Sequence, residues 1–236
     1  MTRLPMSVAL VVVVLLSGCS PAEAPDTATT VDMELESLRQ RAEEGDADAQ
    51  YELGFVYETG LGVSQDDVEA ARWYRLAADQ GLAVAQYNLG VMYVVGRGVP
   101  EDFAEGARWF RLAADQGHIA SQSRLGGLYL VGMGVLQDYE EAHRWTRLAA
   151  DQGFASAQFN LGTMYDRAEG VPKDDVEAHK WLNLAASRFN DREQADDREE
   201  AVKSRDALAA LMTPAQIAEA QTLAREWQAA FDARQE

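Results

Sequence analysis

Apolar residues recur along the chain in two alternating helical patterns. Ala49, Leu53 and Tyr57 are four residues apart, which places them on one face of an α-helix. Residues 70, 73 and 77, which are Ala, Trp and Ala, follow at spacings of three and four and predict a second amphipathic helix. Both patterns return every 36 residues. The chain is therefore expected to consist of helix pairs whose apolar stripes face each other.

The repeats align without insertion or deletion over 144 residues, and the heptapeptide RLAADQG occurs verbatim in three of them. A fixed period between about 20 and 50 residues is typical of a solenoid, in which each unit buries its apolar face only against its neighbours. The sequence therefore predicts an all-α solenoid. Its four units are expected at Asp46–Gly81, Leu82–Gly117, His118–Gly153 and Phe154–Phe189.

Turn and capping residues mark the helix ends within each unit. Gly60 stands where the first helix should end in a left-handed residue, and Gly62 follows it. Asp66 and Glu69 have the spacing of a capping box, which would begin the second helix. RLAADQG then ends that helix, with two alanines for close contact and a glycine at the C-terminal cap.

A glycine lies in the middle of every first helix, at Gly54 and its equivalents. Such a residue destabilises a helix by roughly 0.8–1 kcal/mol relative to alanine. Its compensation would be a close approach of the tryptophan-bearing helix. We therefore expect the four repeat tryptophans to be core residues: Trp73, Trp109, Trp145 and Trp181.

Residues 85–117 of the second repeat, AQYNLGVMYVVGRGVPEDFAEGARWFRLAADQG, resemble a Sel-one-like repeat, the 36-residue relative of the tetratricopeptide repeat. The resemblance implies a right-handed α-solenoid that acts as an adaptor and binds a protein or peptide in its concave groove. Unit four departs from the pattern at Ala168 and at Ser187–Phe189, as a terminal repeat does.

The family relationship also assigns the first helix of each unit to the groove. On that basis the partner-binding residues are expected to be Tyr51, Phe55, Tyr87, Val91, Val94, Val95, Leu130, Val131 and Phe159. These side chains could form an open apolar patch, or they could bury against a neighbouring helix or the C-terminal cap. The sequence leaves both alternatives open.

Capping helices are predicted on both sides of the repeats. Residues 32–45 read as an N-terminal capping helix, with Ala42 and Gly45 in register with the end of the second repeat helix. Residues 190–236 should form two C-terminal helices. The last one begins with Thr213-Pro214 and carries Ile217, Ala220, Ala224, Trp227 and Phe231 on one face.

The first residues have the pattern of an export signal. Arg3 precedes an apolar run over residues 7–16, which is about half the length of a membrane-spanning helix. The following tetrapeptide LSGC resembles a bacterial lipoprotein processing box, which predicts removal of residues 1–18 and lipidation of Cys19, the only cysteine. An ordinary signal peptide with an incidental cysteine is the alternative.

The residues after the cysteine bear on location. Residues 19–31 are expected to form the lipidated cysteine and a flexible tether, because they contain no large apolar side chain before Val31. Ser20 resembles an outer-membrane sorting signal, so we expect an outer-membrane lipoprotein that faces the periplasm. The inner membrane remains an alternative.

Charge narrows the class of partner. The net charge is −18, and the acidic excess lies in the first repeat and at the two ends, whereas the other three repeats are each at −1. Nucleic acid and anionic lipid surfaces both require clustered basic residues. The sequence therefore favours a protein or peptide partner and a membrane attachment through lipid alone.

Catalytic signatures are sparse. The chain has no Ser-x-x-Lys and no His-Glu-x-x-His, and it lacks the cysteine pairs of those family members described as β-lactamase-like. His143 and His179 occupy equivalent positions, and a solvated helix face is a better interpretation than a metal site. We expect no enzyme activity, metal or cofactor. A hydrolase of β-lactams or cell-wall material and an immunity or regulatory lipoprotein are the alternative functions.

Overall fold

The structure is a computed structural model that describes residues 27–189 and 194–235. The secondary-structure elements formed by these residues are α-helices, as predicted. The chain divides into two compact units, one that ends at Asp102 and one that begins at Phe103.

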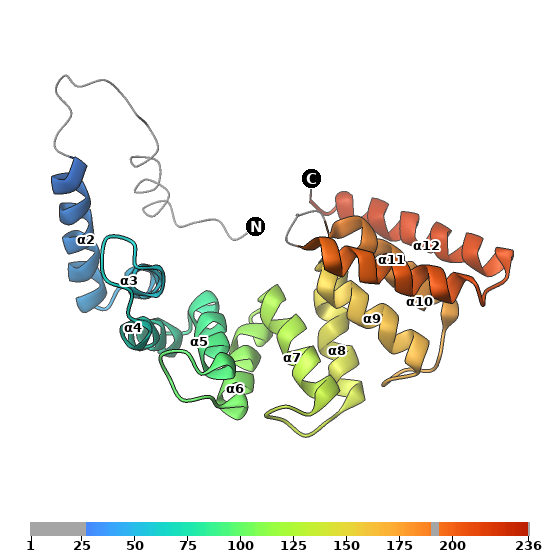
Figure 1. The fold of residues 1–236 in the computed structure, drawn as a ribbon, viewed down its shortest axis with the longest axis horizontal. Coiled ribbons are helices and arrows are strands. Elements are labelled where there is room, and N and C mark those ends of the chain that lie inside the picture. The colour runs from blue at the N-terminus through green and yellow to red at the C-terminus, as the bar shows by residue number, and fades with distance from the viewer. Residues whose placement is uncertain (1–26, 190–193, 236) are drawn as a thin grey trace, which may run out of the picture. The chain divides into compact units, whose positions relative to one another are not determined.

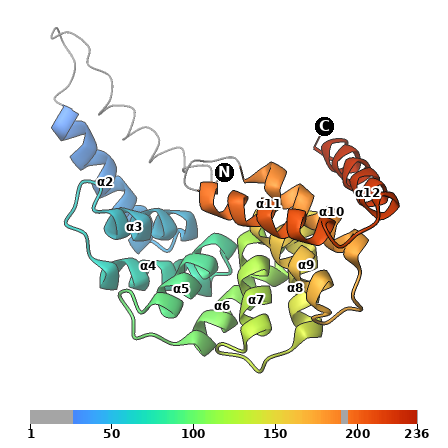
Figure 2. The same cartoon turned by 45° about the vertical axis from the view of Figure 1, so that its right-hand side comes forward.

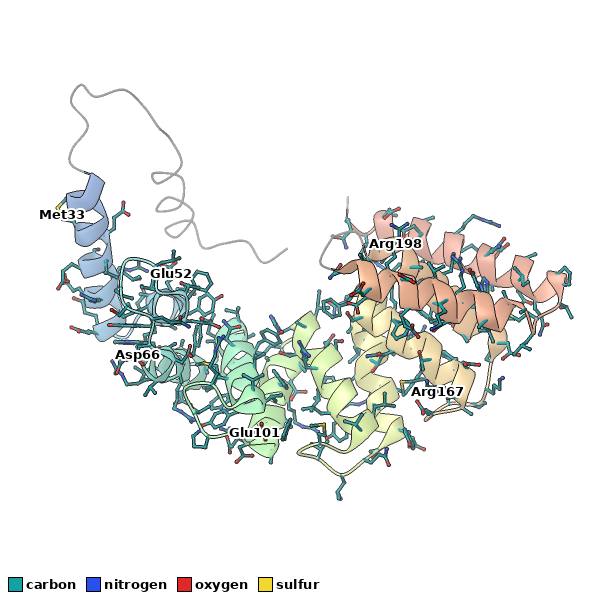
Figure 3. All side chains as sticks on the ribbon, viewed as in Figure 1. Met33, Glu52, Asp66, Glu101, Arg167 and Arg198 are labelled. Carbon is teal, nitrogen blue, oxygen red and sulfur yellow. The ribbon has the colours of Figure 1, made fainter. Side chains whose placement is uncertain are left out.

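The described residues of the first unit form four helices, and consecutive helices pack against each other (Figure 1). They are α2 (Thr27–Glu43), α3 (Ala47–Thr59), α4 (Asp67–Asp79) and α5 (Ala83–Val95). Ala42 of α2 shares a core with Ala49, Leu53 and Trp73. Met33 lies on the side of α2 that faces away from α3 and is exposed (Figure 3). Helix α2 therefore covers the first repeat in the way predicted for a cap.

The boundaries of this cap differ from the prediction of residues 32–45. Helix α2 begins at Thr27, so the last part of the predicted flexible tether is helical, and it ends at Glu43 before a turn. No proline or glycine lies between Thr27 and Glu44, so nothing in this segment interrupts helical hydrogen bonding.

In the second unit, the part of the chain that the structure describes contains seven helices. They are α6 (Phe103–Asp115), α7 (Ile119–Val131), α8 (Tyr139–Asp151), α9 (Ala155–Arg167), α10 (Asp175–Arg188), α11 (Ala195–Ala209) and α12 (Pro214–Asp232). Helices α6 to α10 pack consecutively, and α10 also contacts both α11 and α12 (Figure 2). The last two helices thus cap the final repeat.

Asp66 begins α4 as an N-cap, because its carboxylate accepts hydrogen bonds from the backbone N–H groups of Val68 and Glu69. Asp138 and Asp174 do the same for α8 and α10. In a capping box the Glu69 side chain would also accept a hydrogen bond from the Asp66 N–H. Here the Asp66 N–H donates to the Tyr57 carbonyl instead, at 3.0 Å.

The mid-helix glycines provide the predicted close approach. A Cβ on Gly54 would lie 2.7 Å from Cδ1 of Tyr74, and one on Gly162 would lie 2.8 Å from Cγ of Leu182. In both pairs the residue that occupies this space is the one after the tryptophan, and Thr146 after Trp145 does the same at Gly126. The four tryptophans themselves are buried, which confirms their assignment to the core.

The second loop glycine of a repeat rests on the preceding repeat. Gly98, Gly134 and Gly170 have left-handed backbone, and a Cβ on them would lie 1.9, 2.2 and 2.0 Å from the carbonyl oxygens of Asp67, Phe103 and Tyr139. Each of those carbonyls belongs to the first residue of a second helix. Only a residue without a side chain allows this contact.

The C-terminal cap seals the fourth repeat. Trp227 of α12 packs edge-on against Trp181 with ring centroids 5.7 Å apart, and Phe231 stacks on Trp227. Leu184 is buried there, whereas its equivalents in the first three repeats are exposed. Thr213 and Gln216 form the predicted capping box of α12. Leu211 lies in the turn before that helix, 80% exposed.

Replacing Gly134 by alanine tests the loop contact. Gly134 and Gly117 both have left-handed backbone, so alanine at either position introduces a similar strain of roughly 1–2 kcal/mol. Only the methyl group at 134 would also overlap the Phe103 carbonyl, because nothing lies within 4 Å of the one at 117. In urea denaturation, we expect Gly134→Ala to lower the free energy of unfolding by about 2 kcal/mol more than Gly117→Ala does. Equal losses would show that the contact adds no stability.

Candidate interaction surface

The nine predicted groove residues differ in how far their side chains are exposed to solvent. Val95, at the end of α5, is 57% exposed, and Val131, at the end of α7, is 58% exposed. The remaining seven side chains are partly buried. The two valines are therefore the members of the predicted set that present the most apolar surface to a partner.

On the first unit, the side chains around Tyr51 are held by neighbours. The rings of Tyr51 and Tyr74 lie 5.6 Å apart, and the Tyr74 hydroxyl donates to Glu58 Oε2 at 2.6 Å. Glu58 also pairs with Arg97 of the following repeat, whose Nε lies 3.5 Å from Asp67 Oδ1. Burial raises the pKa of Tyr51. This network fixes the first two repeats against each other.

On the second unit, the C-terminal cap reaches one of the predicted groove residues. Phe159 packs against a cluster that contains Phe189 and Ala201, and against a second one that contains Leu208 and Met212. These residues come from the end of the fourth repeat, from α11 and from the turn that follows it. Phe159 thus packs against the C-terminal cap, which is the second of the two alternatives that the sequence left open.

Sequence reasoning missed a buried glutamine that joins successive helices in all four repeats. The side-chain amide of Gln50 donates to the Ala42 carbonyl at 3.0 Å, and that of Gln86 donates to the Ala78 carbonyl at 3.1 Å. In the second unit, the side-chain amides of Gln122 and Gln158 likewise donate to the carbonyl of the residue eight positions earlier in the chain. The recurrence of glutamine at this position was the available signal.

The arginine of RLAADQG also joins repeats. Arg75 hydrogen-bonds to the Tyr93 hydroxyl, and Arg111 hydrogen-bonds to the Tyr129 hydroxyl. Arg147 lies 3.5 Å from the Tyr165 hydroxyl, with its guanidinium over the Trp181 ring. Each pair joins a second helix to the first helix of the next repeat. The conserved spacing within the chain thus has a structural cause rather than a catalytic one.

The two equivalent histidines do not lie on a solvated helix face, which corrects the prediction. His179 is 3% exposed, and His143 is partly buried edge-on against Tyr165. Burial lowers the pKa of both imidazoles, and for His179 the nearby Arg205 adds to the effect while Asp206 opposes it. No group of three His, Cys, Asp or Glu side chains that could hold a metal occurs in the described residues.

Cys19, the predicted lipidation site, lies outside the described residues together with residues 1–18. The lipidation prediction therefore rests on the sequence. In the part of the chain that the structure describes, no helix has both the length and the apolar character needed to cross a bilayer.

Tandem helix pairs that bury their faces only against neighbours define a class of helical repeat protein whose fold serves as a scaffold for protein–protein interaction. The Sel1 repeat family model matches residues 47–82, 83–118, 119–154 and 155–188. The chain belongs to the Sel1 repeat family, whose repeats correspond within one residue to the predicted units.

Solved structures support this assignment. A Sel1 repeat protein from Oxalobacter formigenes is 34% identical over 69% of this chain and 67% of its own length, with a TM-score of 0.64. A protective antigen of uropathogenic Escherichia coli with an SLR fold is 27% identical over 90% of this chain, with a TM-score of 0.55. This chain spans 52% of the latter's length. No match is found among the curated proteins.

Because His179 is buried, we expect the free energy of unfolding to depend on pH. The pKa of His179 is lowered by folding from its usual 6.5, so the unfolded chain takes up the proton first as the pH falls. We expect the free energy of unfolding to be constant above about pH 7 and to decrease as the pH falls through about 6.5 toward 5.5. Carboxylates titrate mostly below this window.

Urea denaturation at both ends of this window measures the effect. His179→Gln, which cannot titrate, should lose part of the pH dependence while His143 and His118 retain theirs. An unchanged pH dependence in this variant would contradict the assignment to His179.

Proposed function

We propose that this chain is a lipid-anchored adaptor of the periplasm, attached to the outer membrane through Cys19, that binds a protein or peptide on the first helices of its repeats. The observation that supports binding there is the exposure of Val95 and Val131 at equivalent positions of α5 and α7. An immunity or regulatory role would be a special case of this binding activity.

The two valines extend the partly buried apolar side chains that precede them. Val91 and Val94 lie on α5, and Leu130 lies on α7, and all three retain some accessible surface. An apolar partner side chain would bury this surface with a gain of about 25 cal/mol for each Å² removed from water. Among these positions only Val95 and Val131 are exposed enough to be changed without effect on packing.

Aspartate at both exposed valines tests the binding surface. We expect the variant Val95→Asp with Val131→Asp to lose only about 0.5–2 kcal/mol of its free energy of unfolding, because both sites are exposed and the main cost is a carboxylate at each of two helix C-termini. It should lose its partner, because charge placed in an apolar contact is left unpaired. The measurement is a crosslinking pull-down from intact cells, compared with the natural chain.

Leu211→Asp provides the matched control, because Leu211 is equally free of the core and lies in the turn between α11 and α12. It should recover the natural partners. The proposed surface is wrong if the valine variant folds and recovers the same proteins at the same yield as the control.

Cys19→Ser tests the anchor. The substitution should abolish lipid attachment. It should also release the chain from the membrane fraction, because the acyl chains hold a mature lipoprotein in the bilayer and the variant would carry none. The helical repeats should remain folded, since the tether and the repeats are separate in sequence. Cell fractionation and mass spectrometry of the N-terminal peptide measure both consequences. A cysteine-free variant that stays in the outer membrane would exclude the lipid anchor.

A further inference from the structure

The loop between α7 and α8 presents an unusual apolar surface. Leu136 is 90% exposed, Met133 is 41% exposed and Tyr139, the first residue of α8, is 40% exposed. Val131 borders them at the end of α7. Four apolar side chains within nine residues thus contact solvent on one loop of the second unit.

The third repeat alone carries this combination. Leu136 corresponds to Ser64, Pro100 and Pro172 of the other repeats, and Met133 corresponds to Leu61, Arg97 and Glu169. In the first unit, Arg97 and Asp67 belong to the ion-paired network with Glu58. Repeat three has methionine and tyrosine at these two positions. Stacking of repeats therefore does not require the apolar residues.

The loop holds these side chains in a defined arrangement. Gln137 donates from Nε2 to the Leu130 carbonyl at 2.8 Å and to the Tyr139 hydroxyl at 3.1 Å. The backbone N–H of Met133 donates to the Leu128 carbonyl, and Gly134 rests on the Phe103 carbonyl. A loop that is ordered before binding loses less conformational entropy when a partner docks.

Acidic residues occur in this loop and in the neighbouring loop between α9 and α10. Gly170, in the loop that follows α9, lies against the backbone of Tyr139 and Glu140, which brings Glu169 beside this surface. Residues 130–140 and 166–175 together contain six acidic and two basic residues. One of the basic residues, Lys173, pairs with Asp166 and Asp175. The other, Arg167, lies at the end of α9 (Figure 3).

Neither Glu140 nor Glu169 forms an ion pair with a described residue, so their charge is available to a partner. A negative rim attracts a cationic ligand and repels an anionic lipid surface. The apolar centre requires a ligand that also contributes apolar side chains.

We propose that the α7–α8 loop, with Met133, Leu136 and Tyr139 at its centre, docks a partner segment that combines apolar and basic side chains, such as a basic amphipathic helix. This inference rests on the proposed function as an adaptor and names the chemistry of its partner. It adds a second surface, which is centred on the loop and shares Val131 at its border with the surface of the first helices.

Synthetic peptides of about 18 residues, roughly five helical turns, serve as probes. One contains leucine and lysine in amphipathic order, a second replaces lysine by glutamate, and a third replaces leucine by serine. The full chain is reconstituted in phosphatidylcholine nanodiscs, and fluorescence anisotropy is corrected with empty nanodiscs. We expect the leucine–lysine peptide to bind at least about tenfold more tightly than either of the others.

Two double variants and one control variant locate the site. Met133→Ser with Leu136→Ser should weaken binding of the leucine–lysine peptide by roughly tenfold to a hundredfold, because two apolar contacts are lost. Leu211→Ser removes another largely exposed leucine of the same unit and should leave the affinity within about twofold. Glu140→Gln with Glu169→Gln should weaken binding and reduce its dependence on salt. Circular dichroism melting verifies that each variant is folded.

Three results would overturn the inference. The serine double variant could bind as the natural chain does, Leu211→Ser could lose as much affinity as the double variant, or phosphatidylcholine vesicles could capture the natural chain and release the double variant. The last result would assign the loop to a membrane contact. If the aspartate variant at 95 and 131 loses its cellular partner while the serine variant keeps both partner and peptide, this inference fails and the proposed function stands.

Discussion

The hydrogen bond from a buried glutamine to the preceding helix is the constraint on which the stacking of repeats depends. A buried side-chain amide without a hydrogen-bond acceptor is destabilising, so each glutamine amide needs an acceptor on the preceding helix. The Ala78 carbonyl accepts from Gln86 and the Ala150 carbonyl accepts from Gln158, in addition to the backbone N–H groups of Gly81 and Gly153. Because the donor lies eight residues after the acceptor, the turn between repeats has a fixed length. The glutamine contact and the loop glycine contact both recur with the 36-residue period.

The two ends of the chain solve the same problem with different residues. At the N-terminal side, α2 provides the Ala42 carbonyl to Gln50, so it acts as the second helix of a preceding repeat. At the C-terminal side, Arg188 lies over the rings of Trp227 and Phe231 and donates to Gln228. Helix α12 thus replaces a fifth repeat, and its contact with Leu184 covers a position that earlier repeats leave in solvent.

Positions outside the glutamine, glycine and tryptophan contacts differ between repeats. In the first unit, Glu58, Asp67 and Arg97 use the loop side for an ion-paired network. In the third repeat the equivalent positions carry Leu130, Tyr139 and Met133, which leave apolar surface exposed. The scaffold tolerates both choices because the glutamine, glycine and tryptophan contacts are made elsewhere. The proposed interaction surfaces therefore rest on differences between aligned repeats rather than on their identities.

The sequence by itself determined the fold class, the repeat boundaries to within one residue, the tryptophan core and the capping box at Thr213, because each depends on local spacing or on the 36-residue period. It placed the nine groove residues on first helices but could not assign their exposure, and it put His179 on a solvated face although the residue is buried. Tertiary structure decided these points, because burial depends on which segments from elsewhere in the chain cover a face. Helices α11 and α12 pack on α10, and no local pattern around His179 or Phe159 records where distant residues such as Arg205 and Met212 will lie.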